Sequence, residues 1–317
     1  MNARTTAISL CSVLAAILAA SCEPQENAAT PAPAPAVAQY TLQNTTHFCG
    51  ENAYHHCAEL CKLGPRPSAS AAYEQQLQYL TRHLQAAGWS VTRQNFSTPG
   101  GVRMTNLHAH FGPRPETTAR PILLTCHIDT KIGIAAPFVG ADDGASAAAV
   151  LLETARILAA EPQLAQRIEL VFFDGEEAFG THMTEQDGLY GSTHDVARRG
   201  PCLPLYQINL DMVGAKNKHI GVPFHDTTPE LLSLFEESVE ALRLSPRRWE
   251  IIDASYLDDN IPFKEAGVST INLIAQFTNS TWWHTPRDTM SRICPISLQE
   301  TGLLTLHLLR RLSASSL

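Results

Sequence analysis

The stretch IELVFFDGEE, residues 168–177, places a nearly unbroken apolar run directly before three carboxylates. The run Ile168–Phe173 predicts a strand that is buried on both faces, which is typical of a largely parallel sheet. A second run with this pattern is Ile122–Cys126, and the Ala- and Leu-rich segment Ala145–Ala160 between the two predicts a crossover helix. These three segments therefore indicate an α/β fold.

The rest of the chain continues the alternation of helices and strands. Strand patterns are found in Val91–Phe96, Met104–His110, Leu205–Val213 and Val268–Ile274. Helical periodicity is found in Ser68–Ala87, Pro229–Leu242 and Ser297–Leu312. No internal repeat is present. The sequence predicts one domain with a three-layer αβα sandwich around a mostly parallel, mixed central sheet.

Composition and charge limit the partners of such a domain. The 317 residues are 44% hydrophobic and 17% charged, which provides enough apolar material for one sizeable core. The formal net charge is −8 and no basic stripe is present, so nucleic acid and anionic membrane surfaces are poor candidate partners. A small molecule or a peptide fits this charge better.

The first 22 residues have the features of an export signal. Arg4 supplies positive charge, Ile8–Ile17 is a short apolar core, and small residues precede Cys22. This ending resembles a bacterial lipobox, although Ala19 stands where Leu is usual. We expect an exported lipoprotein of the periplasm or cell envelope that contacts the membrane only through lipid on Cys22. Plain secretion after cleavage nearby is the alternative.

Residues 23–45 are rich in Pro and Ala and lack a periodic apolar face. Such a composition predicts an extended, semi-rigid spacer. We expect the folded domain to span residues 46–317 and to be a monomer.

Acidic and imidazole side chains gather where the predicted strands end, which is where open α/β sheets carry their function. In chain order they are His127, Asp129, Asp142, Asp143, Asp174, Glu176, Glu177, Asp211, Asp258, Asp259 and His284. A helix cap or a solvated loop would explain any one of these carboxylates alone. So many together repel one another unless protons or a cation neutralise them. Carboxylate and imidazole ligands favour zinc.

Seven motifs of this chain resemble, in order, those of the glutaminyl cyclases. They are CHIDTK (126–131), FVGADDGASA (138–147), FFDGEEAF (172–179), QDGLYGS (186–192), NLDMVGA (209–215), LDDNIPF (257–263) and WHT (283–285). That family comprises zinc-dependent glutaminyl-peptide cyclotransferases, which share a fold with the bacterial zinc aminopeptidases. The resemblance extends from about Arg66 to the C-terminus.

The resemblance implies closure of the N-terminal Gln of a peptide to pyroglutamate with release of ammonia, and it implies roles for seven side chains. These are Asp143, Glu177 and His284 as ligands of one zinc ion, Glu176 as general acid and base, Asp211 and Asp258 as a hydrogen-bonded acidic pair, and Trp283 as a wall of the substrate pocket. The adjacent Glu176 and Glu177 can differ in role because consecutive side chains of an extended segment point in opposite directions.

The chief alternative is hydrolysis by a two-metal aminopeptidase of the same fold. The ligands of those enzymes match His127, Asp143, Glu177, Asp211 and His284, so the ligand set does not separate the two activities. Cyclisation is favoured by the insertion Ala178–Asp187, the doublet Asp258-Asp259 and the Trp283 that precedes His284. A non-catalytic binding protein on this fold is a third reading, but such a protein would be expected to have lost ligands.

Several positions depart from the pattern of the animal cyclases, among them the loop Gly180–Met183, which lacks their Trp, and the segment Ala275–Trp282. Asn272 stands where they have a His, and Ala148 replaces the disulfide partner of Cys126, which we expect to be a buried and inert thiol. Cys49, Cys57 and Cys61 lie among several His residues, but their spacing matches no standard zinc knuckle. In an exported chain a disulfide among these three is the more natural expectation.

Overall fold

The computed structural model describes residues 42, 43, 45–112, 120–134, 137–184, 186–217, 219–278 and 280–315. The predicted signal segment, its lipid attachment at Cys22 and nearly all of the predicted spacer lie outside these residues. The described strands form one sheet in the order β1-β2-β4-β3-β5-β8-β6-β7. Their bounds are β1 (Trp89–Ser97), β2 (Arg103–Phe111), β3 (Ile122–His127), β4 (Ile168–Phe173), β5 (Tyr206–Asp211), β6 (Ile220–Pro223), β7 (Trp249–Ile252) and β8 (Ser269–Ala275).

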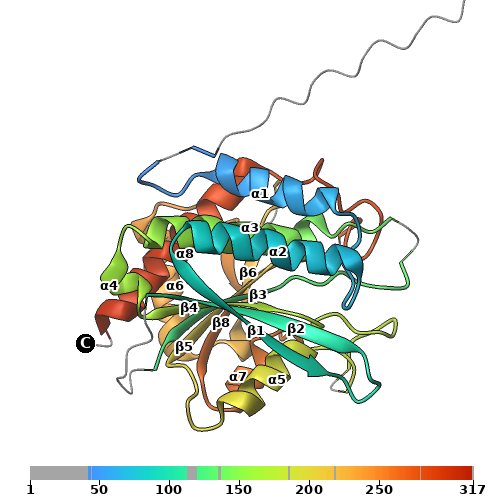
Figure 1. Ribbon diagram of the computed structural model, residues 1–317. Coiled ribbons are helices and arrows are strands. Elements are labelled where there is room, and N and C mark those ends of the chain that lie inside the picture. The colour runs from blue at the N-terminus through green and yellow to red at the C-terminus, as the bar shows by residue number, and fades with distance from the viewer. Residues whose placement is uncertain are drawn as a thin grey trace, which may run out of the picture. The chain divides into compact units, whose positions relative to one another are not determined.

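Helices cover both faces of this sheet (Figure 1). One face carries α1 (Gly50–Lys62), α2 (Ala71–Ala86), α3 (Ala147–Leu158), α6 (Pro229–Ala241) and α8 (Pro295–Ser315), and the other carries α5 (Tyr190–Arg199) and α7 (Ile261–Glu265). Shorter pieces are η1 (Ala141–Ser146), α4 (Pro162–Ala165) and η2 (Phe224–Asp226). The predicted three-layer αβα sandwich is confirmed.

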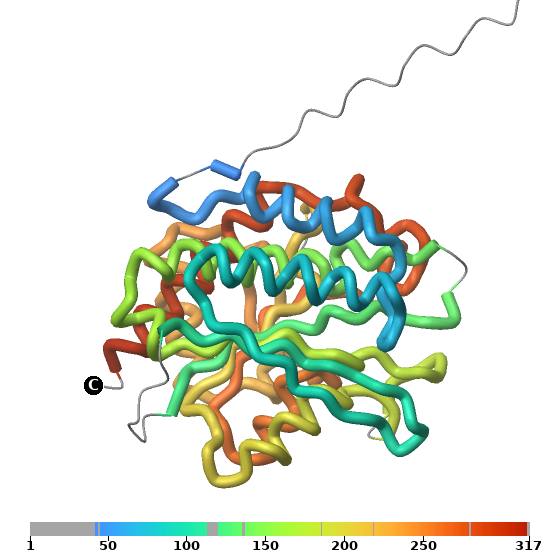
Figure 2. Tube along the Cα trace, in the orientation of Figure 1, coloured from blue at the N-terminus to red at the C-terminus, as the bar shows by residue number. Residues whose placement is uncertain are grey.

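The centre of the sheet is parallel. Strand β3 pairs in parallel with β4 and β5, and β5 pairs in parallel with β8. Antiparallel pairing is confined to β1, β2 and β4 on one side and to β6 with β8 on the other. The carboxyl ends of four neighbouring strands, β4, β3, β5 and β8, therefore meet at one edge of the sheet, and Figure 2 traces the loops that follow them.

The apolar runs are buried on both faces, as their sequence pattern predicts. Every residue of β3 and β4 is buried. Leu124 and Leu170 belong to the large core under α3, whereas Leu123 and Val171 pack with Phe263 of α7 on the opposite face. Full burial of such a side chain stabilises the fold by about 1.5–3 kcal/mol. Because successive side chains of the two strands are buried on opposite faces, each face of the sheet is held against its own layer of helices.

Helix α1 and strands β6 and β7 were not predicted from the sequence. The buried face of α1 carries polar side chains such as Asn52 and His56, so its apolar periodicity is weak. Strands β6 and β7 have only four residues each, which is too short for a clear alternation.

The expected disulfide among Cys49, Cys57 and Cys61 is wrong, because all three are free thiols. Cys57 and Cys61 lie on successive turns of α1, and the Cys57 Sγ donates to the Ala141 carbonyl at 3.2 Å. Cys126 is a buried free thiol, as expected, and burial raises its pKa well above the ordinary value. None of the described helices is both long enough and apolar enough to cross a bilayer.

Candidate active site

The predicted site residues meet at the edge where the parallel strands end. His127 and Asp211 are the last residues of β3 and β5, Glu176 and Glu177 follow β4, and the others lie on loops or in η1. Two groups of ligand atoms form there, with all atoms of each group within 4.8 Å of one another. We call Asp143, Glu177 and His284 the outer triad, and His127, Asp143 and Asp211 the inner triad. Asp143 belongs to both.

The outer triad has the spacing of a metal site. The His284 Nε2 lies 3.2 Å from Glu177 Oε2 and 3.4 Å from Asp143 Oδ2. Ligand atoms that bind zinc at 2.0–2.1 Å in a tetrahedron lie about 3.3 Å apart. Asp143 Oδ2 and Glu177 Oε1 are buried and have no hydrogen-bond partner. Because buried polar atoms are almost always satisfied, these oxygens fit a cation as their missing partner.

The inner triad is closed by a hydrogen bond. The His127 Nε2 lies 3.2 Å from Asp211 Oδ1, within hydrogen-bond geometry, and also 3.2 Å from Asp143 Oδ1. Its Nδ1 has no hydrogen bond but lies 3.6 Å from Asp129 Oδ1. Burial alone lowers the pKa of His127, but these three carboxylates outweigh it and raise the pKa well above the ordinary value. A proton on His127 Nε2 therefore satisfies its contact with Asp211.

Two buried aspartates hold the backbone of the ligand-bearing segments. Asp288 accepts the N–H of Asp142 at 2.9 Å and that of Asp143 at 3.1 Å, with one carboxylate oxygen each. Asp129 accepts the N–H of Glu176 at 3.1 Å and that of Glu177 at 3.2 Å in the same manner. We call these contacts the Asp288 clamp and the Asp129 clamp. Each fixes the backbone of two consecutive acidic residues through their N–H groups.

Neither clamp is predicted by the sequence pattern. Asp129 was one of the side chains at the strand ends, and Asp288 lies only four residues after His284, which is the one local signal for it.

Close backbone contact brings the two triads together. A Cβ on Gly144 would lie 2.6 Å from the His127 carbonyl oxygen and 2.9 Å from the His127 ring. Only glycine therefore lets the segment after Asp143 pass so close to β3. His284 itself has a φ of 50°, a left-handed conformation that a non-glycine residue keeps only where its surroundings impose it.

Glu176 differs from its neighbour Glu177 in surroundings. Burial raises the pKa of Glu176 well above the ordinary value, and the charges of Glu177, Asp258 and Asp259 raise it further, against the opposing effect of His127. Glu177 interacts instead with Asp143 and His284. Burial raises the pKa of both carboxyls, but only Glu177 contacts His284, so the two side chains lie in different environments.

Asp211 and Asp258 lie near each other but do not form the expected hydrogen-bonded pair among the described residues. Asp258 accepts from the Asn209 side-chain amide at 2.9 Å and from the Asn272 amide at 2.7 Å, whereas Asp211 bonds His127. Burial raises the pKa of Asp211 to about 7, and the charge of Asp258 contributes. Asn272, a departure from the animal cyclases, therefore provides one of the two amides that hold Asp258.

An aromatic row lies beside the outer triad. Trp283 stacks on His284 with ring centroids 4.0 Å apart, and Phe277 lies 4.6 Å from Trp283. Tyr256 continues the row at 4.9 Å from Phe277. Trp283 exposes 36% of its surface, so part of its ring remains accessible beside the triad. Phe277 and Tyr256 carried no motif that pointed to this position.

Comparison with known proteins assigns the chain to a family. The profile described as Peptidase family M28 matches residues 106–309. The glutaminyl-peptide cyclotransferase of Boiga dendrophila is 30% identical over 297 residues, which cover 80% of this chain and 78% of that protein. The glutaminyl-peptide cyclotransferase-like protein of Bos taurus is 32% identical over 242 residues, which cover 66% of this chain and 62% of that protein.

Solved structures agree with this assignment. The glutaminyl cyclase of Porphyromonas gingivalis is 29% identical with a TM-score of 0.73, and the match covers 83% of this chain and 98% of that one. A Zn-dependent exopeptidase from Parabacteroides distasonis, 24% identical with a TM-score of 0.71 over 83% of this chain and 98% of that one, shares the fold. Fold and comparisons define an α/β enzyme with the fold that zinc exopeptidases share. The chain belongs to peptidase family M28 and, within it, to the glutaminyl-peptide cyclotransferases.

Proposed function

We propose that the protein converts the N-terminal Gln of peptides or proteins to pyroglutamate and releases ammonia, with one zinc ion held by the outer triad. The observation that carries the proposal is the contrast between the triads. The outer triad has buried carboxylate oxygens without partners, whereas the inner triad is closed by the hydrogen bond of His127 to Asp211. One ion suits cyclisation, because the α-amine of the substrate is itself the nucleophile and no activated water is required.

Zinc in the outer triad would supply Lewis acidity toward the γ-carbonyl of the bound Gln. The donor set of two carboxylates and one imidazole leaves a position open for that oxygen. The Asp288 and Asp129 clamps keep Asp143 and Glu177 in place before substrate arrives. Preorganised ligands of this kind need little rearrangement during the reaction.

Glu176 would carry the proton. As the α-nitrogen forms its bond to the side-chain amide carbon, Cδ, Glu176 accepts the proton that this nitrogen loses. It then donates the proton to the departing amide nitrogen, whose bond to Cδ breaks, and ammonia leaves. This transfer requires a carboxyl whose pKa is raised, and burial among Glu177, Asp258 and Asp259 raises that of Glu176.

Trp283 would orient the substrate. Its ring stacks on His284 and remains partly exposed, so it can cover the side chain of Gln when this is folded back on its own amine. Ring closure is intramolecular, and holding the folded form removes much of the remaining entropic cost.

A second candidate function is aminopeptidase activity, which the inner triad favours because it completes a two-metal ligand set. The deciding experiment incubates the purified protein with a Gln-peptide and with a Leu-arylamide and follows ammonia and arylamine separately. We expect ammonia from the first and no arylamine from the second. Arylamine release without cyclisation would replace the cyclase proposal with the peptidase one.

We also propose that the protein is exported and anchored by lipid on Cys22, which the small residues before that cysteine support. Mass spectrometry of the mature N-terminus tests this proposal. A lipid-modified Cys22 is expected, and an unmodified N-terminus at another residue would exclude the anchor.

A further inference from the structure

We propose that a basic pocket at the edge of the sheet binds an organic anion that carries a carboxylate. The pocket has a volume of about 270 Å³ and is built from two segments that are distant in the sequence. Lys216 and His219 line it from the connection between β5 and β6, and Trp282 and Arg292 line it from the connection between β8 and α8. We call it the basic pocket.

The topology places the basic pocket at the edge of the sheet that carries the triads. Strands β5 and β8 are parallel and end at Asp211 and Ala275, and Ala275 is part of the pocket wall. Strand β6 runs antiparallel to β8 with Ile220 opposite Ala275, so it begins at this same edge. Trp282 packs with Ala275 in an apolar cluster that Phe277 of the aromatic row also contacts. The basic pocket and the aromatic row therefore share one apolar support.

Two cations of the basic pocket have no acidic partner. Lys216 is exposed and Arg292 is half-buried, and neither forms an ion pair within the part of the chain that the structure describes. Arg292 donates to Thr281 Oγ1 at 3.3 Å, which uses only one of its five N–H groups. In a chain with a formal net charge of −8, two cations that the protein itself does not neutralise favour an anion from outside.

His219 differs from these two cations because it has an acidic neighbour. Its Nδ1 lies 3.9 Å from Glu250 Oε1, and the Gln276 side chain donates to the same oxygen at 2.6 Å. Glu250 belongs to β7 and does not line the pocket. An anion in the basic pocket would therefore depend on Lys216 and Arg292 for its charged contacts.

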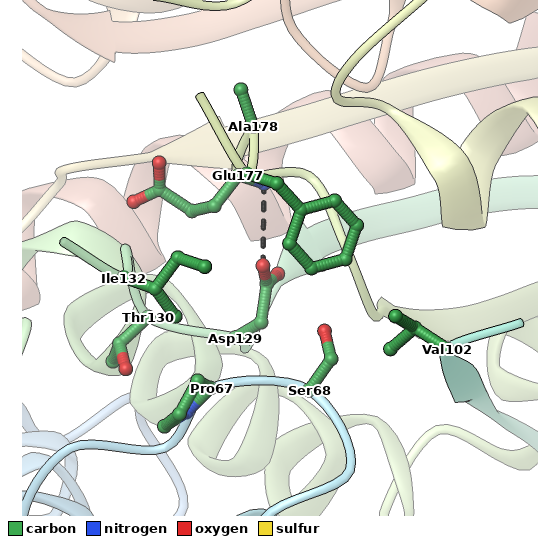
Figure 3. Close-up of a pocket in the computed structure, with 9 residues that line it drawn as sticks. Pro67, Ser68, Val102, Asp129, Thr130, Ile132, Glu177 and Ala178 are labelled. Carbon is green, nitrogen blue, oxygen red and sulfur yellow. Dashed lines mark hydrogen bonds between the residues drawn. The ribbon is translucent and has the colours of Figure 1, made fainter. Parts of the chain in front are cut away.

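A hollow of similar size that includes Glu177 of the outer triad has the opposite charge. Its volume is about 290 Å³, and its walls include the carboxylates of Asp129 and Glu177 (Figure 3). Its described lining contains no basic side chain. An anion is repelled by this acidic hollow and attracted to the basic pocket. The charge of the two hollows therefore separates their ligands.

Backbone hydrogen bonds hold the two walls of the basic pocket together. The Lys216 N–H donates to the Arg292 carbonyl at 2.7 Å, and the Gln276 N–H donates to the His219 carbonyl at 2.9 Å. The first of these bonds places the two unpaired cations side by side. Walls that are joined before the ligand arrives need little ordering on binding.

The donors and the apolar wall together favour an organic carboxylate. A guanidinium binds a carboxylate with two parallel hydrogen bonds, and a lysine adds a point charge. Trp282 and Ala275 provide apolar surface for the carbon chain of the ligand, which inorganic phosphate lacks. A cavity of about 150 Å³ holds a benzene molecule, so the basic pocket has room for a small dicarboxylate.

Titration calorimetry with succinate and the zinc-saturated protein tests the inference. We expect one saturable site, and a loss of affinity of about tenfold or more in Lys216→Gln and in Arg292→Gln, since each removes a charged donor. Arg287→Gln is the matched control. Arg287 also contacts Thr281, through the Thr281 carbonyl at 3.4 Å, but it does not line the pocket. This variant should bind succinate as the wild type does.

Three results would overturn the inference. These are absence of saturable binding, wild-type affinity in both pocket variants, and binding of inorganic phosphate as tight as that of succinate. The titration involves no turnover, so its outcome is independent of the proposed function.

A competition experiment identifies the source of the carboxylate. It uses pyroglutamyl peptides of equal length that carry Asp or Asn. Displacement of succinate by the Asp peptide alone supports the site and assigns it to acidic peptides. Bound succinate that neither peptide displaces supports the site and assigns it to a free organic acid. Equal displacement by both peptides would contradict recognition of a carboxylate.

Discussion

The outer and inner triads share Asp143 and use the same kinds of side chain, yet they satisfy their buried atoms in different ways. In the inner triad a proton on His127 bridges to Asp211 at 3.2 Å. In the outer triad Asp143 Oδ2 and Glu177 Oε1 have no hydrogen-bond partner, although His284 Nε2 lies 3.4 Å from Asp143 Oδ2. Because an unsatisfied buried polar atom costs about 1–3 kcal/mol, the outer triad is suited to a cation and the inner triad to a proton. Ligand identity alone does not give the number of metal ions.

The largest expected effect separates the proton carrier from the ligands. Glu176→Gln should lower kcat for cyclisation by about 10²–10⁴-fold, because the neutral amide no longer accepts the proton of the attacking amine. Zinc content should not change, since Glu176 is outside both triads. Steady-state kinetics with metal analysis by mass spectrometry checks both points. Activity close to that of the wild type would remove Glu176 from this role.

The next effect separates the two triads. His284→Ala removes an outer ligand and should weaken zinc binding by more than about 100-fold, beyond the loss typical of groups that only support a ligand. Asp211→Asn changes the inner triad alone and should retain one equivalent of zinc, since the amide oxygen still accepts from His127. Competition with a chromophoric chelator measures both affinities. Equal losses of zinc affinity in the two variants would contradict the assignment of the metal to the outer triad alone.

A smaller effect tests the Asp288 clamp. Asp288→Asn replaces one of the two accepting oxygens with an amide donor that faces the N–H of Asp142 or Asp143. Zinc affinity should decrease by about 10-fold, as for other groups that orient a ligand. Glu300→Gln, in α8, where Glu300 pairs with Arg248 rather than with a ligand-bearing segment, is the control and should bind zinc as the wild type does. Full affinity in Asp288→Asn would show that the clamp does not position Asp143.

The smallest effect concerns the zinc-free protein and its inner triad. The folded-state pKa values of His127 and Asp211 are both raised, that of Asp211 to about 7. A raised folded pKa contributes stability that is present at low pH and is lost as the pH rises through that pKa. Between pH 5 and 8 the zinc-free protein should therefore lose stability as these groups give up their protons. Asp211→Asn should flatten this slope in urea unfolding, and an unchanged slope would contradict the assignment.

Much of this arrangement could be predicted because it is encoded locally. The apolar run Ile168–Phe173 coincides with β4, and the carboxylates after it lie at the edge where the parallel strands end. The motif resemblance then supplied the members of the outer triad, which the structure brings together.

What could not be predicted depends on contacts between distant segments. Asp288 reaches back to η1 across 145 positions of the chain, and Asn209 and Asn272 come from different strands to hold Asp258. Contacts between residues so far apart in the chain produce no recognisable spacing pattern in the sequence. The hydrogen bond predicted between Asp211 and Asp258 is not found among the described residues for the same reason. Each carboxylate instead bonds side chains that lie on other elements.

Anomalous diffraction at the zinc edge, from crystals of the zinc-saturated protein, tests the central claim most directly. We expect a single peak among Asp143, Glu177 and His284, with His127 still hydrogen-bonded to Asp211. A second peak of comparable height between His127 and Asp211 would contradict the account and favour the two-metal peptidase.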